Sequence, residues 1–326
     1  MNSNREDGST PRIGGQAIIE GVMMRSPEYV SAAVRLPGGE IQKKVWPSKP
    51  WYKRRKFLGW PIMRGIASLS EALVLGIRTL NWSADVALES EREGRERAHR
   101  KWDALGMAGS LLFAIAIAIA LFMLVPYQLA NILKTSENQP LFHLVAGTVR
   151  IALFLAYIWL ISQLKDIRRV FQYHGSEHQA IFTYENREEL TSENARNKSC
   201  FHPRCGTSYL LIVALLTMAF FVLFDTAVVA IWGSYRNVLV RLLVHLPALP
   251  LVAGASYELL RLSDRLSHTP FFRALITPGL ALQRMTTRPP DDTQREVALC
   301  ALIAALPNNE SRHVEESELQ IRPLAD

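Results

Sequence analysis

Four long apolar stretches constrain the fold of this chain more than any other feature of its sequence. They cover roughly residues 105–129, 141–164, 207–232 and 238–259. Each is long enough to cross a bilayer as an α-helix, which takes about 20 residues. We therefore expect an α-helical polytopic membrane protein with four transmembrane helices, a small N-terminal β-sheet and cytoplasmic amphipathic helices.

The basic residues predict the orientation of the four spans. The net charge is +7, and nearly all Lys and Arg lie before the first span, between the second and third, and after the fourth. The turns near Lys134 and Arg236 hold very few. Because short basic segments stay on the cytoplasmic side, we expect a multi-pass protein of the cell membrane with both termini and the loop 165–206 in the cytoplasm. Membrane lipid is then the expected partner of the positive charge, and nucleic acid is not.

Two further sequence properties agree with this placement. The start of the chain lacks the apolar segment of a cleaved signal peptide, so the first span would itself direct insertion. Three cysteines in a cytoplasm-facing protein argue against a disulfide framework.

Polar segments surround the predicted membrane domain, residues 105–260. Residues 13–50 form a β-segment, residues 51–104 an interfacial helical segment and residues 261–306 cytoplasmic helices. The polar ends, residues 1–12 and 307–326, are expected to be disordered.

The β-segment places polar side chains where a site could use them. Three strands are predicted, over residues 16–25, 29–36 and 40–46. Side chains alternate between the faces of a strand, so Gln16 and Glu20 share one face. With Arg25, they would line a polar site beside the loop 165–206.

Amphipathic helices are expected on both sides of the membrane domain. Residues 57–80 are apolar but interrupted by charges, which favours a helix lying at the cytoplasmic interface; a re-entrant hairpin is the alternative. After the fourth span, a helix over 270–285 should break near Pro278. Asp291 and Asp292 should cap a last helix that ends near Ala305.

The loop between the second and third spans carries two motifs with metal-binding residue types. The first, Tyr173-His174-Gly175-Ser176-Glu177-His178, matches H-x-x-E-H, which places His174 and His178 on one helix face with Glu177 beside them as a possible base. The second, His202-Pro203-Arg204-Cys205, would deliver His202 and Cys205 from one turn to a tetrahedral ion. Nitrogen and sulfur donors favour zinc.

The number of ligands would decide the role of such an ion. Four protein ligands would make a closed structural site, whereas three would leave a position for water on which Glu177 could act. Glu258, at the cytoplasmic end of the fourth span, is a reserve ligand. In the simpler alternative the histidines lie among lipid headgroups, His202 caps the third span and Cys205 is a buried thiol.

Two ionisable residues fall inside the apolar spans. Isolated charges are unfavourable there and are usually paired. Arg150 and Asp225 are therefore expected to form an ion pair between the second and third spans. A structural role is the first interpretation, and a substrate or proton path is the second.

Four pieces of the sequence resemble the YqhQ-like family of bacterial membrane proteins. They are GGQAIIEGVMMR at 14–25, YHGSEH at 173–178, HPRCGT at 202–207 and LQRMTTRPPDD at 282–292. Ser176 and Gln179 depart from the alanine and lysine expected in that family, but neither is a proposed ligand. The resemblance implies a multispanning fold and a metal site at His174, Glu177, His178, His202 and Cys205, in a group described as predicted metal-dependent enzymes; it names no substrate.

Three functions follow as hypotheses. The first is a zinc-dependent hydrolase that acts on a peptide or lipid-linked substrate, with Glu177 catalytic. The second is a membrane assembly factor or scaffold in which the metal is structural. The third, a small transporter, depends only on Arg150 and Asp225, and the absence of an internal repeat disfavours it.

Overall fold

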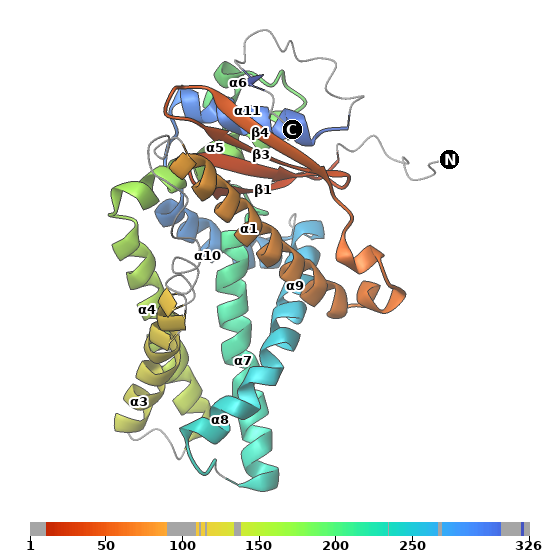
Figure 1. The fold of residues 1–326 in the computed structure, drawn as a ribbon. Coiled ribbons are helices and arrows are strands. Elements are labelled where there is room, and N and C mark those ends of the chain that lie inside the picture. Colours follow the sequence, from red (N-terminus) through yellow and green to blue (C-terminus); the bar gives the residue numbers. More distant parts are fainter. Residues whose placement is uncertain are drawn as a thin grey trace. The chain divides into compact units, whose positions relative to one another are not determined.

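The computed structural model describes residues 11–89, 109–110, 112–114, 116–133, 138–233, 235–266, 269–307 and 321–322 (Figure 1). The chain divides into two compact units. The first unit comprises Met1–Glu93, Ser162–Cys205 and Leu280–Asp326, and the second comprises Gly94–Ile161 and Gly206–Gly279. The fold is mostly helical, as expected. Most of the two predicted disordered ends lies outside the described residues.

The sheet of the first unit is an antiparallel meander of four strands to which a short fifth is added. Its order is β1-β2-β3-β4-β5, and β5 pairs in parallel with β4. The strands are β1 (Gly14–Ile18), β2 (Gly21–Arg25), β3 (Tyr29–Arg35), β4 (Ile41–Pro47) and β5 (Ile321–Arg322). Two residues of the C-terminal tail are therefore ordered against the sheet.

The prediction of three N-terminal strands was wrong at the first of them. Residues 16–25 fold into a hairpin in which Ile18 pairs with Gly21 across a two-residue turn. Glu20 adopts φ 53°, a left-handed conformation that ends the strand. The alternation of side chains cannot run through such a turn, so the two halves of the segment face different neighbours.

Helices cover both faces of this sheet. On one face, Val22 and Met24 pack with Tyr173 of α5 (Lys165–Glu185) and Leu302 of α11 (Asp292–Ala305). On the other, Ile18 and Met23 share a second cluster with α1. Neighbouring residues of a strand point to opposite faces, and this explains why β2 is apolar along its length rather than alternating.

Helix α1 (Met63–Glu89) follows two 3-10 turns, Trp51–Lys53 and Lys56–Gly59. One side of α1 packs on the sheet through residues that include Val86. The opposite side leaves Leu73, Val74 and Ile77 at 65%, 52% and 51% exposure. The amphipathic character predicted for this region is thus present in one continuous helix.

The ends of the C-terminal helices follow the sequence signals closely. Asp291 caps α11 through a reciprocal capping box with Gln294, as the Asp-Asp pair predicted. The expected break at Pro278 was wrong, because α10 (Pro270–Thr286) continues through it. A proline removes one backbone donor and kinks a helix, but the helix can resume beyond it.

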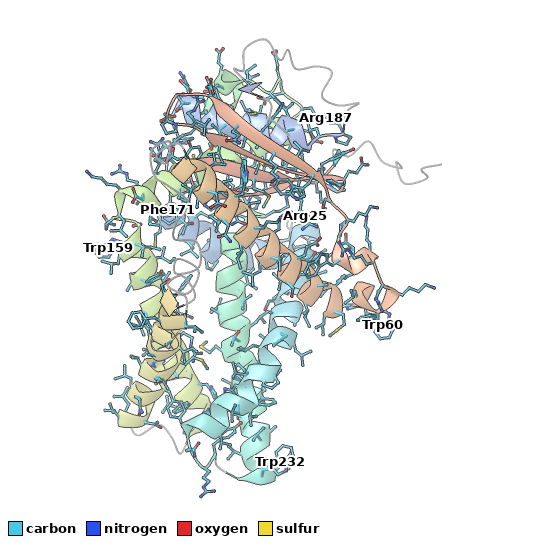
Figure 2. The ribbon with its side chains drawn as sticks, in the orientation of Figure 1. Arg25, Trp60, Trp159, Phe171, Arg187 and Trp232 are labelled. Atoms are coloured by element: carbon cyan, nitrogen blue, oxygen red, sulfur yellow. The ribbon has the colours of Figure 1, made fainter. Side chains whose placement is uncertain are left out.

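The second unit contains four helical segments with the length and composition of membrane spans: Leu112–Ile132, Pro140–Ile161, Ile212–Trp232 and Leu243–Ser263. They correspond to the four predicted stretches. They include the π-helical turn Ala120–Leu124 with α3 (Val125–Ile132), α4 (Gln139–Ile161), α7 (Gly206–Trp232) and α9 (Leu249–Arg265). Trp159 and Trp232 lie exposed near span ends, where aromatic residues meet a membrane surface (Figure 2). The short helix α8 (Val238–His245) precedes the 3-10 turn Leu246–Ala248 and α9.

Candidate metal centre

Helix α5 brings two imidazoles to one buried face of the first unit. His174 and His178 are four residues apart, so they lie one turn above each other. Their ring centroids are 4.5 Å apart. The residues are only 9% and 1% exposed, because the second half of α5 is covered by the sheet and by α11.

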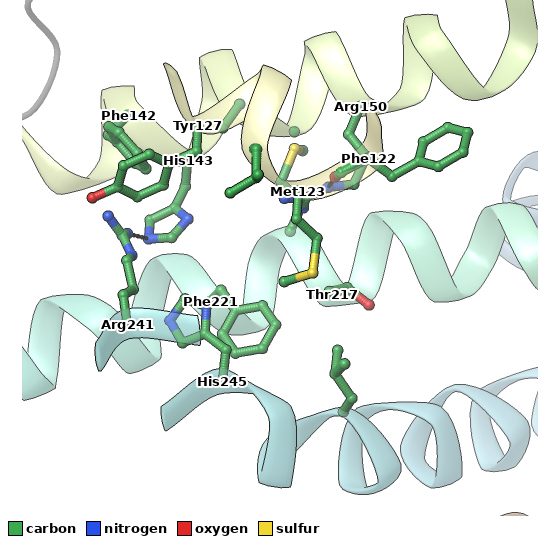
Figure 3. A pocket seen from close by; sticks show the side chains of 15 residues that line it. Phe122, Met123, Tyr127, Phe142, His143, Arg150, Thr217, Phe221, Arg241 and His245 are labelled. Carbon is green, nitrogen blue, oxygen red and sulfur yellow. Dashed lines mark hydrogen bonds between the residues drawn. The ribbon is translucent and has the colours of Figure 1, made fainter. Parts of the chain in front are cut away.

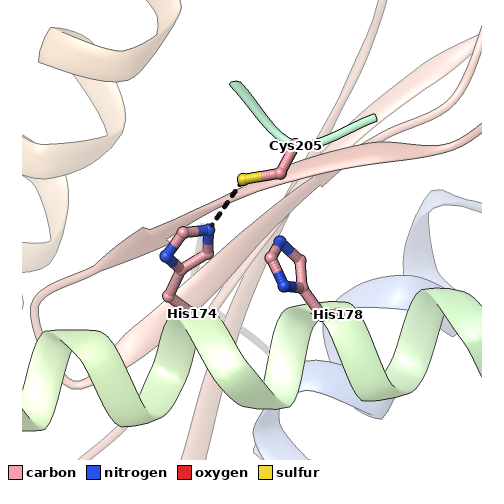
Figure 4. Close-up of side chains that lie close together, drawn as sticks. All are labelled: His174, His178 and Cys205. Atoms are coloured by element: carbon pink, nitrogen blue, oxygen red, sulfur yellow. Dashed lines mark hydrogen bonds between the residues drawn. The ribbon is translucent and has the colours of Figure 1, made fainter. Parts of the chain in front are cut away.

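Cys205 completes a group of three donors (Figure 4). It lies at the end of the loop that returns from α6 (Ser192–Arg196), directly before α7. Its Sγ is 3.1 Å from Nε2 of His174, and the donor atoms of His174, His178 and Cys205 lie within 4.8 Å of one another. Atoms at these separations can surround one ion.

The hydrogen bonds of the two Nδ1 atoms fix the orientation of the His174 and His178 rings, so that the Nε2 atoms are the ones on the side of Cys205. Nδ1 of His174 donates to the backbone oxygen of Thr286 at 2.8 Å, and Nδ1 of His178 donates to that of Cys200 at 2.5 Å. A carbonyl oxygen only accepts, so each Nδ1 carries the proton of a neutral ring. The Nε2 lone pairs are then available as ligands. Metal-bound histidines are typically oriented by this kind of second hydrogen bond.

The two ring nitrogens of His178 have different surroundings. Its Nε2 is buried and makes no hydrogen bond among the described residues, although Cys205 lies close enough to influence it. Burial lowers the pKa of His178, which keeps the ring neutral as metal binding requires. Two imidazole nitrogens and one thiolate are a donor set that fits zinc.

Gln283 of α10 positions the loop that carries Cys205, and it is not among the site residues predicted from the sequence. Its side chain accepts from the backbone nitrogen of His202 at 2.8 Å and donates to the backbone oxygen of the same residue at 2.7 Å. Gln283 is completely buried. The signal was present, because Gln283 and Thr286 both fall within the segment 282–292 that carried the family resemblance.

The backbone of the segment after α10 approaches α5 closely beside Gly175. A side chain at Gly175 would collide with the backbone oxygen of Arg288, whose nitrogen donates to Phe171 of α5 at 2.9 Å. The absence of a side chain at Gly175 therefore lets the segment after α10 reach the helix that bears both histidines.

Glu177 lies beside the three donors and faces β1. A Cβ atom added to Gly15 would be 2.8 Å from its carboxyl carbon, so the glycine leaves space for the acid. Burial raises the pKa of Glu177, while His174 and His202 act in the opposite direction. Its oxygens are not part of the three-donor group.

His202 is not brought into the donor group. Its Nε2 lies 3.4 Å from Glu185, and its Nδ1 accepts from the backbone nitrogen of Arg204 at 3.3 Å. Both ring nitrogens therefore have partners in the protein. Among the described residues the donor group therefore has three members, and an ion bound to all three would have one tetrahedral position left for another group.

The three predicted site residues of the β-segment each contact a different neighbour. Gln16 approaches Gly76 of α1, whereas Glu20 pairs with Arg169 of α5. The expected common face of Gln16 and Glu20 was wrong, because Glu20 lies in the turn after β1. Arg25 forms a 2.9 Å ion pair with Glu71 of α1.

Glu258 lies on α9 in the second unit and is outside the three-donor group.

The predicted intramembrane pair also differs from the structure. Asp225 is fully buried and pairs with Arg241 of α8, not with Arg150. The side chains of His143, Tyr235 and His245 contact the same carboxylate at 2.9, 2.7 and 2.6 Å. Asp225 lies near the end of its span and can meet α8 there. Arg150 lies deeper along α4 and donates from Nε to the backbone oxygen of Phe122 at 2.8 Å.

The fold and the site define a membrane protein with two units. The second unit contains four spans, and the first packs a helix with two buried histidines against a small sheet. Residues 60–308 match the family described as "Protein of unknown function (DUF1385)". The chain is also 34% identical to the protein YqhQ of Bacillus subtilis (strain 168), described as uncharacterized, over 89% of this chain and 90% of that protein. The chain belongs to this family, and the resemblance to YqhQ-like proteins is confirmed. No solved structure matches the chain.

A double-mutant cycle distinguishes the two possible partners of Asp225. We expect Asp225→Asn and Arg241→Gln each to destabilise the protein in detergent by roughly 3–5 kcal/mol, since each leaves a buried group without its partner. Together they should cost less than their sum, with a coupling of about 1–3 kcal/mol. Asp225→Asn and Arg150→Gln should be additive. Coupling of Asp225 to Arg150 instead would contradict the pairing.

Proposed function

We propose that this membrane protein holds one zinc ion between His174, His178 and Cys205 and uses it for hydrolysis. The convergence of two Nε2 atoms and a thiol sulfur carries the proposal. The hydrogen bonds on the two Nδ1 atoms support it, because they direct both lone pairs toward the same point.

Metal content tests the ligand set. The full chain purified in detergent should carry about one zinc per molecule, and His178→Ala should lose it, since three-ligand sites need every protein donor. His202→Ala is the matched control, because His202 is similarly buried in the same unit but its nitrogens bond to Glu185 and Arg204. Equal zinc in wild type and His178→Ala, or equal loss from both variants, would refute this ligand set.

The residues around the donor group support hydrolytic chemistry. A bound zinc ion supplies Lewis acidity and a nucleophile at neutral pH. Glu177 is adjacent to His178 in the chain, lies against Gly15 and interacts electrostatically with His174. In the proposed mechanism its carboxylate would orient the attacking group and transfer the proton of that group to a leaving group. A peptide or lipid-linked substrate is the class that suits a site in a membrane protein.

Glu177→Gln separates catalysis from metal binding. It should retain zinc while lowering the rate of hydrolysis of an activated ester such as 4-nitrophenyl acetate by roughly 10²–10⁴-fold, because a positioned general base contributes about that much. His202→Ala should keep most of the rate. A wild-type rate in the Glu177→Gln protein would remove Glu177 from the mechanism.

A structural zinc ion is the second candidate, and the burial of the three donors favours it. An ion held there would join α5 to the loop before α7 and stabilise the fold. This structural role would suit an assembly factor or scaffold. In that case chelation lowers the melting temperature, and neither wild type nor Glu177→Gln hydrolyses the ester.

We propose further that both termini and the loop 165–206 are cytoplasmic, from the distribution of Lys and Arg. The measurement is labelling of introduced cysteines by a membrane-impermeant maleimide in spheroplasts. Asn138→Cys, before the second span, should react from outside, whereas Glu188→Cys should react only after lysis. The reverse pattern would invert the topology.

A further inference from the structure

The second unit contains a partly open cavity of about 250 Å³ (Figure 3). Its walls come from the π-helical turn with α3, and from α4, α7, α8 and α9. Most of the lining is apolar, including Phe142, Met218, Phe221 and Leu249. Arg150 of α4 and Arg241 of α8 also line it (Figure 3). A mostly apolar cavity with a few charged groups is the usual form of a small-molecule site.

The charge of Arg241 is already balanced within the protein. Its guanidinium pairs with Asp225 and lies over the ring of Phe142 at 4.4 Å from the centroid. His143 and His245 also contact the Asp225 carboxylate. This end of the cavity needs no external anion.

The positive charge of Arg150 is not balanced in this way among the described residues. It lies ten residues after Pro140 and eleven before Ile161, so it is about 15 Å from either end of its span and close to the middle of a bilayer. Its Nε is used by the backbone oxygen of Phe122. No carboxylate among the described residues pairs with it. An arginine at this depth normally faces a partner or a cavity that supplies one.

We propose that this cavity binds a small organic monoanion, a carboxylate whose apolar body packs among the aromatic side chains and whose headgroup pairs with Arg150. The size of the cavity supports this class, because about 150 Å³ accommodates benzene and the larger volume accommodates a ring with a short acidic side chain. The proposal concerns the second unit and does not depend on the metal centre.

The depth of Arg150 argues against a bilayer phospholipid as the occupant. A phospholipid keeps its headgroup at the membrane surface, about 15 Å from the midplane. To reach Arg150, that headgroup would have to leave its leaflet. A free carboxylate has no such anchor.

Binding of 3-phenylpropionate to the full chain in a neutral detergent tests the proposal, with the uncharged 3-phenylpropanamide as the matched probe. Calorimetry should show saturable binding of the acid and much weaker binding of the amide. Arg150→Gln should weaken binding of the acid by roughly 10- to 100-fold, because it removes a charge-assisted contact. Arg150→Lys should lose less, and Arg236→Gln, at an exposed arginine in the turn before α8, should bind as wild type.

Leu249→Phe gives a second variant that leaves Arg150 in place. By filling the cavity it should weaken binding of the acid while the protein elutes as a single folded species. Equal binding of acid and amide, or unchanged binding in both Arg150→Gln and Leu249→Phe, would overturn the proposal. It would also be overturned if an anionic phospholipid co-purifies through Arg150 and the free carboxylate does not bind.

Discussion

The hydrogen bonds on the outer nitrogens of His174 and His178 hold the polar centre of the first unit in place. One reaches Thr286 at the end of α10, and the other reaches Cys200 in the loop before α7. Two segments far apart in sequence are thereby attached to one face of α5. Because each bond requires a protonated Nδ1, the tautomer that organises the fold is also the tautomer that presents two lone pairs to Cys205. Packing and ligand chemistry are therefore coupled.

The second unit contains charged side chains inside an apolar helix bundle. Asp225 is surrounded by guanidinium, imidazole and hydroxyl groups from α4, α8 and the turn before α8, so its buried carboxylate is well satisfied. Removing one partner of such a group commonly costs about 3–5 kcal/mol. Arg150 receives only a backbone acceptor from the described residues, and it faces a cavity. This contrast is the basis for proposing a structural role for Asp225 and a binding role for Arg150.

Local signals in the sequence were sufficient for the spans, for the cap of α11 and for the shared face of His174 and His178. These depend on hydropathy, on one capping residue and on helical spacing, all of which act within a few residues. Two of the differences came from contacts between residues that are far apart in the sequence. Nothing near Asp225 indicates that Arg241 will displace Arg150 as its partner, and Gln283 acts on His202 across 81 residues of sequence. The turn at Glu20 was missed because Ile19-Glu20 lacks the glycine or asparagine that marks most tight turns.

X-ray absorption at the zinc edge of the purified protein is the most direct test of the proposed zinc centre. A zinc ion bound to His174, His178 and Cys205 should show one sulfur at about 2.3 Å, two imidazole nitrogens at about 2.0–2.1 Å and one further light atom. The sulfur should disappear in Cys205→Ser, while Cys200→Ser should leave the spectrum unchanged. A zinc spectrum without sulfur, or one with three imidazoles and one sulfur, would contradict the three-ligand centre.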